Sequence, residues 1–316
     1  MQVSSRHLSI LLYIVAACIF FGFSIYYMQF YIHGDQRAYR GFYESILNAP
    51  IAELPLLQQR HTGSAEPLYG ILMWVGAQFT SKDIWISVFN AVLGLIVLRL
   101  LISRRVSLYI YPLIFSNFYL IVLFFGAERL KFAVIMALLF IASSGRWKYV
   151  FALLAPMFHF QIFLLAGALA GGQFSTLVRG VFAGKLRLLS IVSTFALAAG
   201  VGLTFLYFSD LIQDKASNYE GAGLSGLWKT VIFFVVAIFF TNDRISTALS
   251  FGILASAILA VGEERVNLMS FFLAITASFS WNRGFNPITI MMLAYFSYTG
   301  VIFLDNIVKF GNGFAR

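Results

Sequence analysis

Charged side chains are scarce in this chain of 316 residues. They make up 11% of it, whereas soluble domains carry roughly 25%. Hydrophobic residues make up 60%, and the mean hydropathy is +0.85. No stretch is long and polar enough to form a separate soluble domain, and the single cysteine, Cys18, excludes a disulfide within one chain. These absences predict an integral membrane protein.

Motifs of several common activities are also missing. The sequence has no phosphate-binding P-loop, no dinucleotide-binding glycine fingerprint, no His-Glu-x-x-His zinc pair and no Gly-x-Ser-x-Gly nucleophile turn. We therefore expect neither an ATP-driven pump nor a lipase-type hydrolase, and we predict no cofactor. His33, Asp35 and His61 match no known ligand spacing, so no metal site is predicted. The absence of an internal repeat argues against an inverted-repeat transporter.

The net charge of +9 does not predict nucleic-acid binding, because the basic residues are spread over short loops. Lys and Arg that hold loops on the cytoplasmic side of a membrane produce the same excess. We expect contact with membrane lipids and none with nucleic acid.

Apolar runs of about 18–25 residues recur along the chain, each long enough to cross a bilayer. Continuous runs predict helices, since a helix satisfies its own backbone in hydrocarbon. The predicted fold is an all-α, polytopic membrane bundle of about nine to eleven helical segments, some re-entrant, in one domain over residues 1–316. The first run is expected to remain a membrane helix, because apolar sequence continues well past Cys18. The apolar pieces, several of them shorter than these long runs, are 8–32, 67–80, 84–102, 106–127, 132–144, 149–171, 188–208, 227–241, 245–261, 266–280 and 286–304.

Two polar stretches, at about 33–66 and about 209–226, are predicted to be external loops. Apolar residues interrupt the first stretch, which favours short amphipathic helices at the membrane interface. The run 67–80 is short for a span, and a re-entrant half-helix there keeps the basic loops on the cytoplasmic side. That topology brings the polar clusters to one external face.

A charged cluster, 128–131, lies between two uncharged runs. An ionisable residue at membrane depth is costly, so it is usually paired or faces a watery cavity, and it marks a candidate functional site. Arginine and lysine there suit an anionic substrate, because guanidinium groups bind phosphate oxygens in pairs.

Other polar residues on the same predicted face complete a candidate site. A carboxylate or a histidine there could accept a proton from a hydroxyl nucleophile, and tyrosine rings suit sugars or the interface. The candidate catalytic residues are Asp35, Glu66, Arg129 and His159. The candidate substrate-binding residues are Arg37, Tyr39, Arg40, Lys131, Lys215, Tyr219 and Arg265.

Each of these residues also has a structural interpretation. Asp35, Arg37 and Arg40 would form a solvated loop, while Arg129 and Lys131 would extend to the lipid head groups. His159 would be a buried, hydrogen-bonded histidine, and Arg265 would pair with a neighbouring glutamate.

The order of these motifs resembles the Wzy-type polysaccharide polymerases, especially their EpsG-like branch. The resemblance is carried by Gly34-Asp35 with Tyr39, Glu66-Pro67-Leu68-Tyr69, Arg129 with Ala133, Arg146 to Lys148 leading to Phe158-His159, Lys215 to Tyr219, and Glu264-Arg265. These motifs cover most of the chain, but each one alone is degenerate. The family often has glutamine after the arginine, where this chain has Leu130.

The resemblance implies a GT-C-like glycosyltransferase of the bacterial inner membrane. It would join oligosaccharide repeat units carried on undecaprenyl pyrophosphate, with a chain-length regulator protein as a candidate partner. Arg129, Lys131 and Arg265 would neutralise the leaving pyrophosphate, while Asp35, Glu66 or His159 would act on the acceptor hydroxyl.

Three other classes remain open at the level of sequence. A transporter or flippase of an anionic lipid-linked glycan would use the same cations as a transit site. A polytopic acyltransferase lacks the arginine and histidine constellation expected around His159. A membrane scaffold would need none of these residues for chemistry.

Overall fold

The structure is a computed structural model that describes residues 5–183, 191 and 226–315. All regular structure in these residues is helical, which confirms the predicted helical class. The predicted run 188–208 and the loop after it lie almost entirely outside the described residues.

The chain divides into two compact units, and each is described by itself. The first contains residues up to Phe160 and from Ile290 onward, and the second contains Gln161–Thr289. The prediction of a single domain stays a prediction.

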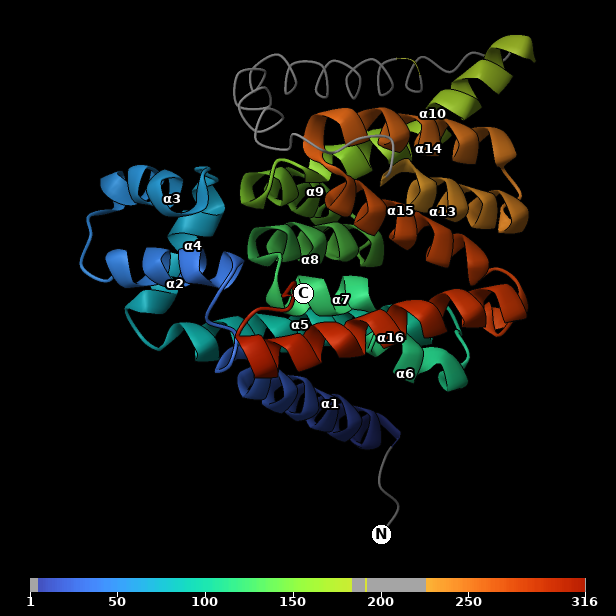
Figure 1. Cartoon of the computed structure of the whole chain (residues 1–316). Coiled ribbons are helices and arrows are strands. Elements are labelled where there is room, and N and C mark those ends of the chain that lie inside the picture. Colours follow the sequence, from blue (N-terminus) through green and yellow to red (C-terminus); the bar gives the residue numbers. More distant parts are fainter. Residues whose placement is uncertain (1–4, 184–190, 192–225, 316) are drawn as a thin grey trace. The chain divides into compact units, whose positions relative to one another are not determined.

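In the described part of the first unit, the order of helices follows the order of apolar runs. The helices are α1 (Ser5–Met28), α2 (Asp35–Ser45), α3 (Leu54–Thr62), α4 (Pro67–Ala77), α5 (Lys82–Ser103), α6 (Tyr111–Phe115), α7 (Phe118–Phe125), α8 (Glu128–Ala142), α9 (Trp147–Phe158) and most of α16 (Pro287–Phe310), with 3-10 turns η1 (Ile51–Glu53) and η2 (Leu108–Ile110). Figure 1 shows these elements coloured along the sequence.

The second unit contains α10 (Ile162–Phe182), α13 (Leu227–Phe240), α14 (Arg244–Val261), α15 (Glu263–Ser278) and a 3-10 turn, η4 (Asn282–Gly284). Within it, α10 packs along α14 and α13 packs against α15 (Figure 1). Gly171 allows the first of these pairs to approach closely, because a Cβ there would lie 2.9 Å from the backbone nitrogen of Ser250.

Three described helices are long and apolar enough to cross a membrane: Ile10–Met28, Lys82–Ser103 and Asn282–Phe310. The bent pair Leu108–Phe115 and Phe118–Phe125 would make a fourth if it is one span. These apolar helices indicate a membrane protein. The predicted continuous run 106–127 is therefore two helices, bent by 50° at a break.

Asn117 lies at that break and caps the start of α7, because its side chain accepts a hydrogen bond from the backbone nitrogen of Tyr119. The predicted run 149–171 is also interrupted, because α9 ends at Phe158 and α10 begins at Ile162. The short helices expected in 33–66 are present as α2 and α3, while their place at a membrane interface stays a prediction.

The central helix of the first unit is α8. It packs against α5, α7 and α9, while α9 also contacts α4, and α4 contacts α2 and α3 (Figure 1). Phe132 of α8 stacks on Phe158 of α9, with ring centres 5.6 Å apart. The first turn of α8 is thus surrounded by the ends of several other segments.

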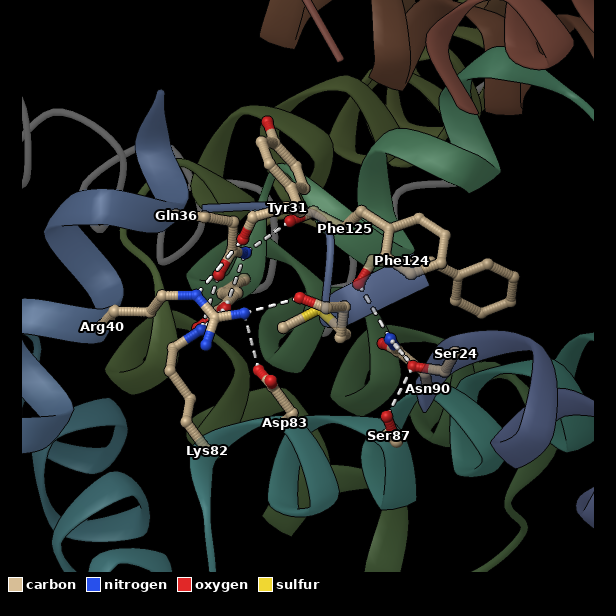
Figure 2. A network of polar contacts seen from close by, with 12 residues as sticks. Ser24, Tyr31, Gln36, Arg40, Lys82, Asp83, Ser87, Asn90, Phe124 and Phe125 are labelled. Atoms are coloured by element: carbon tan, nitrogen blue, oxygen red, sulfur yellow. Dashed lines mark hydrogen bonds and ion pairs between the residues drawn. The ribbon is translucent and has the colours of Figure 1, made fainter. Parts of the chain in front are cut away.

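A polar network joins α1, α5 and α7 inside this unit. Asn90 donates to Ser24 Oγ at 2.7 Å and to the carbonyl of Phe124 at 2.9 Å, and Ser24 and Ser87 share a hydrogen bond of 2.8 Å. Figure 2 shows these side chains converging from the three helices. Such hydrogen bonds between apolar helices fix their register.

The two ends of the unit are also joined. The carbonyl of Gly311, just after α16, accepts hydrogen bonds from the backbone nitrogens of Ile32 and His33, at 3.1 and 2.8 Å. The contact lies immediately before α2.

We expect Gly300→Ala to destabilise the first unit. A Cβ at Gly300 would lie 2.1 Å from the carbonyl oxygen of Ser116, at the break between α6 and α7. Backbone cannot yield as a flexible side chain can, so the expected loss is on the order of 1–3 kcal/mol in the free energy of unfolding. Thermal unfolding in detergent measures it.

Gly22→Ala is the matched control. Gly22 lies in apolar α1, and a Cβ added there would meet no other atom within 4 Å, so alanine should leave the unfolding temperature unchanged or raise it slightly. Equal unfolding temperatures for the two variants would contradict the packing argument.

Candidate functional site

The buried charges of the described chain gather in one region of the first unit. They are Glu66, Lys82, Glu128, Arg129 and Lys131, and His159 is buried beside them. Isolated buried charges are strongly unfavourable, so their concentration at one place marks this region as the candidate site.

The first turn of α8 supplies the core of the site. Helix geometry turns each residue by about 100°, so Glu128 and Lys131 share one face while Arg129 points elsewhere. All three side chains are buried, with Arg129 the most exposed at 6%. The site therefore has two parts, one around Glu66 and one around Glu128.

The Glu66 cluster consists of that carboxylate and four surrounding polar side chains. Glu66 immediately precedes α4, whose first residue is Pro67. Its Oε1 lies 2.8 Å from His159 Nδ1. Its Oε2 accepts from Gln58 Nε2 at 2.9 Å, Ser64 Oγ at 2.6 Å and Arg129 Nη1 at 2.8 Å.

These contacts keep Glu66 ionised. Burial by itself raises the pKa of the Glu66 carboxyl, but the hydrogen bond from His159 and the positive charge of Arg129 outweigh it. The net effect lowers the pKa from 4.5 to about 2. Glu66 is therefore a fixed negative charge and a weak base.

The charge of Glu66 also fixes the tautomer of His159. An ionised carboxylate can only accept hydrogen bonds, so the proton at the 2.8 Å contact belongs to Nδ1 of His159. In the neutral imidazole the lone pair is then on Nε2. This orientation is the one that a general base requires.

The Glu128 cluster draws its members from three other helices. Glu128 Oε1 accepts from Gln36 Nε2 of α2 at 2.8 Å and from Lys82 Nζ of α5. Its Oε2 accepts from the hydroxyl of Tyr69 of α4 at 3.1 Å. Lys82 donates in addition to Gln36 Oε1 at 2.6 Å, and its ammonium lies 5.8 Å from the centre of the Tyr39 ring.

Two cationic nitrogens in the site have no hydrogen-bond partner in the part of the chain that the structure describes. They are Nζ of Lys131 and Nε of Arg129. Lys131 has no exposed surface at all. Donors of this kind are the groups that an anionic ligand would satisfy.

The candidates on α2 have different surroundings. Tyr39 is buried and its ring lies 6.1 Å from that of Tyr69, whereas Asp35 and Arg37 are exposed. Arg40 ties α2 to its neighbours: it donates to the carbonyls of Met28 and Tyr31 and pairs with Asp83 at 2.8 Å. Figure 2 shows Arg40 between these groups, which favours a structural role for it over substrate binding.

The remaining three candidates lie outside the described part of the first unit. Arg265 is half-buried in the first turn of α15, which belongs to the second unit. Lys215 and Tyr219 lie outside the described residues.

Sequence reasoning missed Gln36, Gln58, Ser64, Tyr69 and Lys82. The sequence does not indicate that Lys82 belongs to the site, because a lysine at the start of an apolar helix normally marks the membrane boundary. A usable signal was the spacing of Glu66 and Tyr69, which places two polar groups one helical turn apart in an otherwise apolar segment. The uncharged amides carry no comparable signal.

Comparison with known proteins adds no relative. No family model matches this chain, and neither a curated protein nor a solved structure matches it. The chemistry of the site therefore has to be argued from its own geometry.

That geometry suits an anionic substrate and a proton transfer. The site offers unsatisfied cationic donors beside a histidine whose tautomer is fixed by a carboxylate. Within residues 5–183 and 226–315, no three His, Cys, Asp or Glu side chains are grouped so that they could hold a metal ion.

We expect Glu66→Gln to destabilise the protein near neutral pH, because it leaves the buried Arg129 without its counter-charge. The expected loss is on the order of 3 kcal/mol in the free energy of unfolding. Since the pKa of Glu66 is lowered, its stabilising contribution is complete above pH 4.5 and is lost as the pH falls towards 2. The difference from wild type should therefore shrink over that range, as measured by thermal unfolding in detergent.

Glu53→Gln is the control, because Glu53 is an exposed glutamate in the same segment of the chain. Its unfolding temperature should follow wild type at every pH. A Glu66→Gln variant as stable as wild type near neutral pH would show that the cluster does not hold an ionised carboxylate.

Proposed function

We propose that the protein is a membrane glycosyltransferase that polymerises oligosaccharide repeat units carried on undecaprenyl pyrophosphate. It would act as a multi-pass, GT-C-like protein at the external face of the bacterial inner membrane, and its product would be a surface polysaccharide. The observation that carries the proposal is the buried cluster of Glu66, Arg129 and His159 beside the ammonium of Lys131, which has no hydrogen-bond partner in the described part of the chain.

A lipid-linked donor agrees with the composition of the site and of the chain. The apolar helices give access to a polyprenyl carrier, and the leaving group is the carrier's own pyrophosphate. No nucleotide-binding motif is then needed, and none is present in the sequence. Arg129 and Lys131 would stabilise the negative charge that develops on that leaving group.

His159 is the residue to which we assign the proton transfer. It would accept the proton of the acceptor hydroxyl at Nε2 while that oxygen attacks the anomeric carbon and the bond to pyrophosphate breaks. Glu66, as a weak base with a lowered pKa, would orient the ring and stabilise the imidazolium. Asp35 is exposed at the start of α2, which favours His159 over it as the base.

We expect His159→Asn to lower the rate of chain extension at least about 100-fold, because asparagine can keep a donor near Glu66 but cannot accept the proton. The assay supplies purified full-length protein with defined lipid-linked repeat units and follows chain length by gel electrophoresis. Membrane abundance and unfolding temperature should stay close to wild type.

His33→Asn is the matched control, since His33 is an exposed histidine in the same unit and should be dispensable. The proposal fails if wild-type protein leaves the repeat units unextended while an established polymerase extends them. Movement of labelled lipid-linked sugar across proteoliposomes without extension would instead favour a transporter.

A further inference from the structure

Lys131 is the unusual residue of the site. It has no exposed surface, its ammonium has no hydrogen-bond partner among the described residues, and the centre of the Phe132 ring is 6.0 Å away. A buried ammonium normally has a counter-ion, since desolvation is otherwise too costly. One carboxylate attracts Lys131 but accepts no hydrogen bond from it.

That carboxylate is Glu128, one helical turn before Lys131 on the same face of α8. Its oxygens already accept from Gln36, Lys82 and Tyr69. Lys82 therefore neutralises Glu128 from a different helix, α5. Lys131 is left with electrostatic attraction to Glu128, opposed by repulsion from Lys82, and with no hydrogen bond.

The pairing of the other charges in the site also leaves Lys131 without a counter-ion. Among the described residues Arg129 is paired with Glu66 and Lys82 with Glu128, so Lys131 is the cation in excess. Burial lowers the pKa of Lys131 to about 7, and a bound anion would stabilise its charged form. In a low-dielectric interior one unit of charge strongly affects the binding of an anion.

We propose that Lys82 is a positioning residue for anion binding: by neutralising Glu128, it keeps Lys131 unpaired, and Lys131 then binds a phosphate group of the substrate. An ammonium with three donors suits phosphate oxygens. The identification of that phosphate as part of a lipid carrier rests on the proposed function, whereas the charge relation among Lys82, Glu128 and Lys131 does not.

Two variants separate this role from a merely structural one. Lys82→Met removes the competing cation, so Glu128 becomes the counter-ion of Lys131 and the site loses its excess charge. In the double variant Lys82→Met/Glu128→Gln, both charges of the pair are absent and Lys131 is again the excess cation. A structural role predicts that the double variant is no better than the single one, whereas our proposal predicts rescue.

The experiment measures binding of undecaprenyl pyrophosphate to the purified full chain in lipid nanodiscs, with undecaprenol and inorganic pyrophosphate as comparison probes. Lys82→Met should weaken binding of the lipid pyrophosphate at least about tenfold, and the double variant should recover to within about threefold of wild type. Undecaprenol should bind more weakly than the pyrophosphate and equally to all variants. If inorganic pyrophosphate follows the same pattern, the phosphate alone is the ligand; if it does not bind, the lipid chain is also required.

The proposal is overturned if Lys82→Met binds as wild type, if the double variant stays as weak as the single one, or if undecaprenol binds as tightly as its pyrophosphate. Should Lys82→Met fail to fold, the double variant decides: it must bind like wild type, and adding Lys131→Met must abolish that binding. Wild-type protein that shows the expected binding pattern but does not extend repeat units would refute the polymerase and leave the role of Lys82 intact.

Discussion

The burial of the charged first turn of α8 is the constraint on which the first unit depends. Removing three ionised groups from solvent is costly, so each needs partners at hydrogen-bonding distance or a ligand. The partners come from α2, from α4 and the segment that leads into it, and from the start of α5. The position of each of these elements is therefore tied to one helical turn.

The two buried carboxylates of the site show how identical chemistry is given different roles. Glu66 receives donors from a histidine, an arginine and two neutral side chains, so it holds His159 and one cation together. Glu128 is bound by a lysine, an amide and a phenol, and the lysine, Lys82, neutralises its charge. In the proposed reaction, the first carboxylate organises proton transfer and the second sets the charge available to the substrate.

Much of the fold follows from the sequence, because apolar runs and their interruptions correspond closely to helices. The candidate residues Glu66, Arg129, Lys131 and His159 were also identifiable, since a charge inside an apolar run is conspicuous. Lys82 and Gln36 were not, because their roles arise from contacts between segments distant in sequence, such as the contact of Lys82 with Glu128. The direction of each side chain depends on how its helix is rotated about its axis and on how it crosses its neighbours. Arg40 is an example: it was a candidate for substrate binding, but its side chain joins α2 to the neighbouring segments.

The hydrogen bonds from Ile32 and His33 to the carbonyl of Gly311 constrain the order of folding. The contact joins residues about 280 positions apart, so it can form only after the chain has been synthesised as far as Gly311. It holds the backbone just before α2, the helix that carries Gln36. Early helices could insert while the ribosome is still translating, but α2 would reach its final position last. Assembly of the candidate site would then wait for the synthesis of Gly311.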